Sequence, residues 1–220
     1  MFCARAALAC SFLAVVGIAL HGAAAQDASP NLQLLAAARA GDSAGVTRAL
    51  AGGATPDARN RDGETALVIA LKAGRPEIAR QMLDAGTDVN LAAANGVTPL
   101  MAAAYAGQTE IARALLAKGA ALDTVDRLKK NAMTYAAGQG STEIVRLLLA
   151  QGVDPNATYA HDLTALMWAA GYGQTETVRA LLAAGARTEA RDDRGKSALD
   201  IAREGNFAET VKILEAAVKT

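Results

Sequence analysis

A period of 33 residues runs through the chain and constrains its fold more than any other feature of the sequence. Several independent series of residues keep this spacing without an insertion or a deletion. Two of the series are glycines, at positions 41, 74, 107, 140 and 173 and at positions 53, 86, 119, 152 and 185. A fixed period of this length is typical of proteins built from stacked supersecondary units. The sequence therefore predicts one continuous array and not two separate globular domains.

Each unit has the pattern of two short helices joined by a turn. In the unit that begins near residue 95, Thr98 is suited to cap a helix and Pro99 to occupy its first position, where a missing N–H costs nothing. Gly107 is suited to end that helix. A second helix follows, in which Ile111 and Leu115 lie at helical spacing. We therefore expect a helix–turn–helix unit that is repeated along the chain.

This pattern resembles the ankyrin repeat. Residues 95–107 read NGVTPLMAAAYAG and residues 110–120 read EIARALLAKGA, close to the family motif. The resemblance covers about residues 30–220. It implies an all-α solenoid of six 33-residue helix–turn–helix units with short turn or hairpin fingers, in which the first and last units cap the array.

Two turns depart from the family pattern. A turn glycine is present at Gly63, Gly96 and Gly195, but Lys129 and Asp162 occupy the equivalent positions. Glycine usually serves a backbone with positive φ there, and side chains at such positions are disfavoured. We therefore expect the turns at Lys129 and Asp162 to be reshaped.

Residues 1–25 have the features of a secretory signal peptide. A single charge at Arg5 precedes an apolar stretch over residues 6–20, and small residues lead to Ala25. The stretch is shorter than the roughly 20 residues that a membrane-spanning helix needs. We expect cleavage between Ala25 and Gln26, a short leader over residues 26–30, a repeat domain over residues 31–220, and no membrane association after cleavage.

The composition also suggests where the mature protein acts. Alanine is abundant and arginine outnumbers lysine, a bacterial style of composition, so we expect the periplasm or release from the cell. Some periplasmic bacterial ankyrin proteins are linked to oxidative-stress defence, and the resemblance implies such a role as one expectation.

The residue types that most enzymes and metal sites need are scarce. The cysteines are Cys3 and Cys10, and the histidines are His21 and His161, so a Cys/His metal site or a nucleophile–histidine pair is not expected. A carboxylate recurs in the second helix of the repeated units, and it lies three residues before a basic residue, as Glu110 lies before Arg113. Pairs at this spacing are typical of a solvated helix face. We expect no catalytic activity, no metal and no cofactor.

The charge balance bears on the partner. The chain has 22 Lys and Arg and 22 Asp and Glu, so it lacks the basic excess that nucleic-acid binding favours. The resemblance implies instead a partner protein, bound by a monomer on the concave face, which is the face formed by the turn tips and the first helices. Family contacts concentrate at these tips and at the ends of the first helices. The candidate binding residues are Arg61, Tyr105, Arg127, Leu128, Lys129, Lys130, Tyr159, His161, Tyr172 and Arg194.

Within this set, residues 127–130 form a basic tip beside a neighbouring tip that carries Tyr159 and His161, and Tyr105 and Tyr172 are expected deeper in the same groove. Sequence drift at solvated turns is the alternative explanation of the basic tip. We interpret Trp168, the single tryptophan, as packing between units rather than as a ligand contact. Two other functions stay open: a secreted effector that acts in another cell, and a small-molecule binder or accessory protein of an enzyme.

Overall fold

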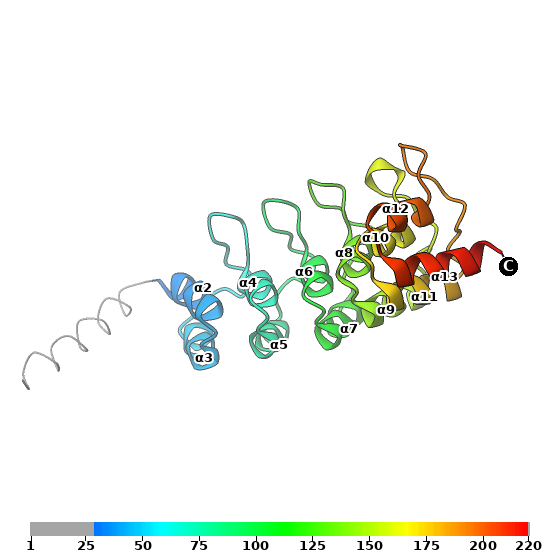
Figure 1. The fold of residues 1–220 in the computed structure, drawn as a ribbon. Helices are drawn as coiled ribbons and strands as arrows, with labels where there is room; N and C mark the ends of the chain where they lie inside the picture. The colour runs from blue at the N-terminus through cyan, green and yellow to red at the C-terminus, as the bar shows by residue number, and fades with distance from the viewer. Residues whose placement is uncertain (1–28, 220) are drawn as a thin grey trace, which may run out of the picture.

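The computed structural model describes residues 29–219, and the predicted signal peptide lies outside these described residues. The described part of the chain contains twelve α-helices, which follow one another as six pairs (Figure 1). The first helices of the pairs are α2 (Pro30–Ala40), α4 (Ala66–Lys72), α6 (Pro99–Tyr105), α8 (Ala132–Gln139), α10 (Ala165–Gly171) and α12 (Ala198–Glu204). The second helices are α3 (Ser43–Ala51), α5 (Pro76–Asp84), α7 (Thr109–Ala117), α9 (Thr142–Ala150), α11 (Thr175–Ala183) and α13 (Ala208–Val218).

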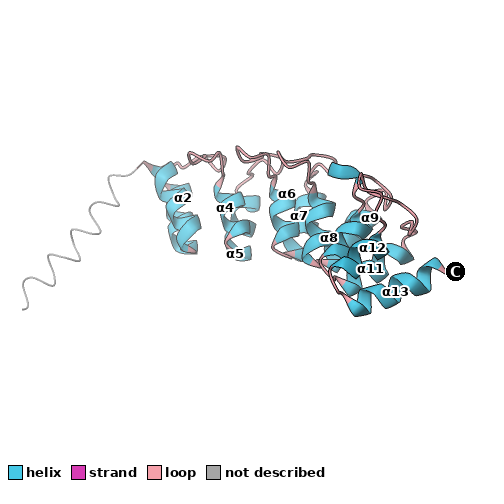
Figure 2. Cartoon of the chain, turned by 45° about the horizontal axis from the view of Figure 1, so that its top comes forward, coloured by secondary structure: helices cyan, strands magenta, loops and turns pink. Residues whose placement is uncertain are grey.

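The pairs stack side by side into an elongated array (Figure 2). Each first helix packs against the first helix of the next pair, from α2 to α12, and the second helices form a parallel row from α3 to α13. No β-strand occurs within residues 29–219. The arrangement confirms the all-α solenoid that the resemblance to the ankyrin repeat implied.

Local sequence sets where the first helices begin. Thr65, Thr98 and Thr164 cap α4, α6 and α10, and each hydroxyl oxygen accepts a hydrogen bond from a backbone N–H in the first turn. Asn131 and Ser197 cap α8 and α12 in the same way. Such caps satisfy N–H groups that the helix itself leaves unpaired.

Small residues let the first helices approach one another closely. Ala103, Ala104, Ala136, Ala137 and Ala170 are all completely buried in the core. Leucine, isoleucine and methionine fill the space between the two rows of helices. The core is therefore continuous along the array, as in other solenoids whose units bury their apolar faces on their neighbours.

Successive units are also joined by one recurring polar contact. A side chain just before the second helix donates a hydrogen bond to a backbone carbonyl of the preceding unit's first helix, over 3.0–3.1 Å. The donors are Gln108, Ser141 and Gln174, and the acceptors are Leu71, Ala104 and Gly138. Phe207 holds this position in the last unit, where its ring packs against Gly173. The C-terminal unit is therefore attached by an apolar contact in place of the polar one.

Five extended loops, here called fingers, project from one side of the array (Figure 1). Their turns lie at residues 60–64, 93–97, 126–130, 159–163 and 192–196, and we number them one to five. Backbone hydrogen bonds link neighbouring fingers: Ala94 N–H to Asp62 O at 2.8 Å, Arg127 N–H to Asn95 O at 3.0 Å, and Asp193 N–H to His161 O at 3.1 Å. In the described part of the chain, no helix is both long enough and apolar enough to cross a membrane.

Candidate binding surface

Finger three, which carries the basic tip, is held in place by a buried carboxylate. Asp126 Oδ1 accepts hydrogen bonds from the backbone N–H groups of Leu128 and Lys130, at 2.8 and 2.9 Å. Asp126 Oδ2 accepts a third hydrogen bond from the Tyr135 hydroxyl at 2.6 Å. Burial raises the pKa of the Tyr135 hydroxyl, and the hydrogen bond to Asp126 raises it further, so the phenol remains a donor. The tip is therefore fixed to helix α8.

The turn of finger three keeps the conformation that glycine adopts elsewhere. Lys129 has a φ of 58°, close to the 69° of Gly63, and its N–H donates to Asp126 O as the N–H of Gly63 donates to Asn60 O. The expectation of a reshaped turn at Lys129 was therefore wrong. Lys129 instead accepts the left-handed conformation, which costs an L-residue about 1–2 kcal/mol.

Finger four is reshaped, as expected at Asp162. A short 3-10 helix, Ala160–Asp162, replaces the simple turn, and both His161 and Asp162 have positive φ, at 61° and 55°. The two fingers without glycine therefore respond differently, one through strain at a single residue and the other through a new turn.

The series of hydrogen bonds between neighbouring fingers is broken between fingers three and four. A Cβ placed on Gly63 would lie 2.8 Å from Ala94 N, and one placed on Gly96 would lie 3.0 Å from Asp126 Cα, in each case on the next finger. Lys129 carries a Cβ atom at this position, and within residues 29–219 no hydrogen bond joins Ala160 N–H to Leu128 O, the pair equivalent to the links between the other fingers. The Cβ atom is not sufficient to break a link, because Asp162 also carries one at the equivalent position and finger four still bonds to finger five.

A row of four aromatic side chains lies on the first helices beneath finger three. The Tyr105 and Tyr135 rings meet edge to face with centroids 6.0 Å apart, and the Trp168 and Tyr172 rings are stacked with centroids 6.1 Å apart. Lys130 Nζ lies between these pairs, 4.6 Å from the Trp168 ring and 5.7 Å from the Tyr135 ring. We call Tyr105, Tyr135, Trp168 and Tyr172 the aromatic row.

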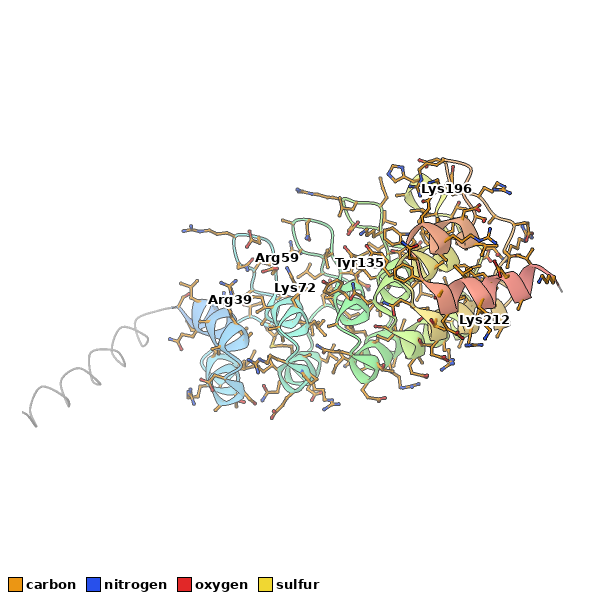
Figure 3. All side chains as sticks on the ribbon, in the orientation of Figure 1. Arg39, Arg59, Lys72, Tyr135, Lys196 and Lys212 are labelled. Atoms are coloured by element: carbon orange, nitrogen blue, oxygen red, sulfur yellow. The ribbon has the colours of Figure 1, made fainter. Side chains whose placement is uncertain are left out.

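The aromatic row is open to solvent at both ends. Tyr105 is 56% exposed and Tyr172 is 54% exposed, and Leu128 at the tip above them is 66% exposed. Next to Tyr105, a groove of about 200 Å³ runs between finger two and helix α6, with Val97 and Met101 among the residues that line it. Tyr135 lies in the angle where the fingers meet the helices, as Lys72 does two pairs earlier (Figure 3).

The structure thus places Tyr105, Lys130 and Tyr172 on one surface, and it adds two residues that the sequence reasoning missed. Tyr135 joins Tyr105 to Lys130, and Trp168 joins Lys130 to Tyr172. Trp168 also packs between units, beside Gly138 of the preceding pair. The sequence did hold a signal, because Tyr135 and Trp168 are 33 residues apart and so occupy the same position in adjacent first helices.

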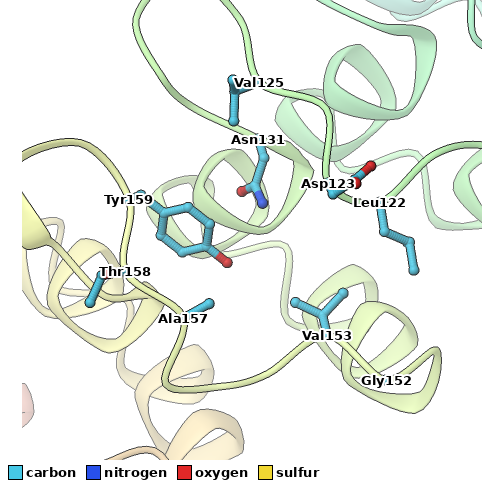
Figure 4. A pocket seen from close by; sticks show the side chains of 9 residues that line it. All are labelled: Leu122, Asp123, Val125, Asn131, Gly152, Val153, Ala157, Thr158 and Tyr159. Carbon is cyan, nitrogen blue, oxygen red and sulfur yellow. The ribbon is translucent and has the colours of Figure 1, made fainter.

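Tyr159 points into a different pocket, of about 400 Å³ (Figure 4). Its neighbours there include Leu122, Val125 and Val153, and the pocket contains no member of the aromatic row. Burial raises the pKa of the Tyr159 hydroxyl, although a hydrogen bond from Asn131 acts in the opposite direction. The ring is partly buried between fingers three and four, so the structure separates Tyr159 from Tyr105 and Tyr172.

The other predicted site residues divide by whether they have a charged neighbour. His161 Nδ1 lies 2.7 Å from Asp193 Oδ2 on finger five, and Arg194 Nη2 lies 2.6 Å from Asp192 Oδ2. Three further basic residues among the predicted set lie on finger tips, namely Arg61, Arg127 and Lys129. They are exposed and take part in none of the ion pairs found within residues 29–219.

The described residues contain no group of three or more His, Cys, Asp or Glu side chains that could hold a metal ion. Of the five carboxylate–base pairs expected on the second helices, the structure forms three, Glu110–Arg113, Glu143–Arg146 and Glu176–Arg179. These pairs are exposed and lie along the helix surface, as a solvated face predicts.

Stacked helix pairs and linked fingers define a helical repeat protein, a class that generally offers an extended surface for binding. The model of the ankyrin-repeat family matches three overlapping stretches, residues 34–126, 74–159 and 133–219. The chain therefore belongs to the ankyrin-repeat family, whose members generally serve as protein–protein interaction modules and are typically non-catalytic. Comparison with curated proteins found no match.

Proposed function

We propose that this protein is a non-catalytic interaction module that binds a partner protein through its concave face, in the bacterial periplasm and with a role in stress defence. The observation that carries the binding proposal is the aromatic row, whose end members Tyr105 and Tyr172 are more than half exposed. Aromatic side chains that stay exposed beside a cation are the kind of residue that dominates binding energy at protein interfaces.

The surface around the aromatic row is rigid before a partner arrives. Asp126 fixes finger three through three hydrogen bonds, and the N–H of Arg127 on the same finger bonds to Asn95 of finger two. Side chains and loops that are already ordered lose little conformational freedom on binding. The strain at Lys129 also fits a functional origin, because strained residues tend to cluster at binding sites.

The periplasmic part of the proposal rests on the sequence of residues 1–25 and on the alanine- and arginine-rich composition. Fractionation of the native host, with mass spectrometry of the mature N-terminus, tests it. We expect the protein in the periplasmic fraction with Gln26 as its first residue. Recovery from the culture medium would favour a secreted effector, and recovery with residues 1–25 retained would refute cleavage.

An affinity pull-down from periplasmic extract tests the binding surface. The bait begins at Gln26, and a triple charge reversal, Arg127→Glu, Lys129→Glu and Lys130→Glu, removes the basic tip. A matched control reverses Arg113, Lys118 and Lys212, which lie in or directly after second helices. We expect one protein to be enriched by the wild-type bait and the control, and lost with the tip variant.

A second pair of variants, Tyr105→Ala and Tyr172→Ala, tests the aromatic row without changing charge. Each is expected to weaken association by at least tenfold while the circular dichroism spectrum stays helical. Equal enrichment by the wild type and all of these variants would show that the partner binds elsewhere. Enrichment of no protein, together with a thermal shift in a metabolite screen, would favour a small-molecule binder.

A further inference from the structure

In fingers one and five, a charged side chain forms an ion pair with the residue eight positions further along, near the end of the following helix. Glu64 in finger one forms an ion pair with Lys72, with Oε1 and Nζ 2.6 Å apart. In finger five the charges are reversed, and Lys196 forms an ion pair with Glu204. Lys130 in finger three would face residue 138, but that residue is Gly138. The fourth unit, which carries finger three, therefore has the lysine of this pairing without its carboxylate.

No carboxylate elsewhere takes the place of the missing partner. None of the ion pairs found within residues 29–219 includes Lys130, and the nearby Asp126 is already bound by two backbone N–H groups and the Tyr135 hydroxyl. Lys130 lies instead over the faces of Tyr135 and Trp168. Arg127 and Lys129 add two further exposed charges on the same tip. The positive charge is thus uncompensated where the aromatic row is exposed.

We propose that the partner docks an acidic, extended segment along the aromatic row and places one carboxylate on Lys130, where Glu204 would lie in the equivalent pairing. This inference rests on the proposed function and specifies the chemistry of its partner. A carboxylate gains most at a lysine that lies beside rings and has no internal counter-charge. Apolar side chains of the same segment contact Tyr105 and Tyr172. An acidic segment is chosen over other partners because its negative charge complements the positive charges of Arg127, Lys129 and Lys130.

Substitution of Gly138 supplies the missing carboxylate from within the chain. A Cβ there would lie 3.5 Å from Tyr172 Cδ2 and 3.7 Å from Trp168 Cε3, which is ordinary contact. Gly138 is buried in the last turn of helix α8, so a longer side chain has to extend past these rings toward Lys130. Gly138→Glu is expected to pair with Lys130 and to compete with the partner. Gly138→Gln has the same shape without the charge and is the matched control.

The probe is a short fluorescein-labelled peptide of alternating glutamate and leucine, compared with a peptide in which glutamine replaces glutamate. In fluorescence anisotropy with the chain from Gln26, we expect the acidic peptide to bind at least tenfold more tightly than the neutral one. We expect Gly138→Glu and Lys130→Gln each to weaken binding of the acidic peptide about tenfold, and Gly138→Gln to bind like the wild type. Added salt should weaken binding by the wild type more than by Lys130→Gln.

Several results would overturn the inference. Equal binding of both peptides, no binding of the acidic peptide, or unchanged affinity in Lys130→Gln would each show that Lys130 does not select a carboxylate. Tighter binding of a labelled single-stranded oligonucleotide would show that phosphate is the preferred anion. If Gly138→Glu and Gly138→Gln weakened binding equally, the added side chain would be blocking the site sterically. The affinity of Lys130→Gln would then decide whether Lys130 selects a carboxylate.

The proposed function fails separately from this inference. A protein captured by the wild type and lost with Tyr105→Ala would support the concave face even if neither peptide bound. Loss of capture with Tyr105→Ala but not with Lys130→Gln would support the proposed binding module. It would refute the inference that the partner docks an acidic segment on Lys130.

Discussion

Replacing Lys129 with glycine should stabilise the protein and close the break between fingers three and four. The backbone at Lys129 already has a φ of 58°, the region that glycine occupies at Gly63, Gly96 and Gly195. Removal of the side chain would relieve this strain and also remove the Cβ atom at the position where Gly63 and Gly96 lie against the next finger. Ala160 N–H could then donate to Leu128 O, as the equivalent groups do between the other fingers.

Three contributions set the size of the effect. Relief of the left-handed conformation contributes about 1–2 kcal/mol. The added freedom of glycine in the unfolded chain offsets about 0.5–1 kcal/mol of this. A new backbone hydrogen bond contributes about 0.5–1.5 kcal/mol. We therefore expect the free energy of unfolding to rise by about 1–2 kcal/mol in Lys129→Gly.

Urea denaturation measures the free energy of unfolding. Lys129→Gly should raise the urea midpoint by about 0.5 M without changing the slope of the free energy against urea concentration. Lys129→Ala is the first control, because it removes the charge but keeps both the Cβ and the strain, and it should leave the midpoint unchanged. Gly195→Ala is the reverse experiment. Its added Cβ would have nothing within 4 Å, but its φ of 75° should make it destabilising by about 1 kcal/mol.

Amide hydrogen exchange separates strain from the new hydrogen bond. The amide of Ala160 should exchange rapidly in the wild type and become protected in Lys129→Gly, while the amide of Asp193 should be protected in both. Protection of Ala160 in the wild type would refute the break between the fingers. An unchanged urea midpoint in Lys129→Gly would show that the positive φ at Lys129 does not strain the folded protein.

Two further predictions concern the C-terminal units. Gly173→Ala should lower the free energy of unfolding by about 1–3 kcal/mol more than Gly74→Ala, because the two glycines have φ of 66° and 65° but only the Cβ at 173 would lie 2.4 Å from Phe207 Cδ1. Equal losses in urea denaturation would contradict this. Hydrogen bonds from Ser197 hold the pKa of Asp200 below its usual value, so its contribution to stability is complete above about pH 4 and is lost as the pH falls through the lowered pKa. In Asp200→Asn, the urea midpoint should therefore decline less between about pH 5 and pH 2 than in the wild type. An equal decline in the two proteins would show that protonation of Asp200 does not contribute to the loss of stability at low pH.

The period predicted a stacked array and the resemblance implied its fold, because every feature that defines a unit is local. Thr98 caps helix α6 and Pro99 starts it, as the sequence indicates, and buried alanines recur where first helices touch. The same reasoning failed at Lys129, because a preference against positive φ does not say whether a chain will change the turn or tolerate the strain. Asp126 settles that choice by fixing the turn from below. Its three hydrogen bonds are visible only in the folded structure.

The candidate site was predictable in its tyrosines and its lysine, but not in how they meet. Tyr105 and Tyr172 occupy different positions of their repeats, so the spacing alone does not place them on one surface. Tyr135 and Trp168 connect them, and each is also partly buried against neighbouring helices. Tyr159 shows the opposite case, since its neighbour Thr158 pairs with Thr164 while the ring turns into the pocket between fingers. The side of a finger on which a residue points depends on its local pairing.

The fourth unit departs from the repeat pattern at Lys129, which replaces a turn glycine, and at Gly138, which leaves Lys130 without an internal carboxylate. The fifth unit has the equivalent departures at Asp162 and Gly171, but only in the fourth unit do they lie beside a lysine over the aromatic row. Neither change improves the stability of the array, because the first adds strain and the second puts a glycine inside a helix. Sequence drift is the alternative explanation of these departures. The proposed binding site accounts for the two together, and it predicts that the pair Lys129→Gly and Gly138→Gln yields a more stable protein that binds its partner less tightly.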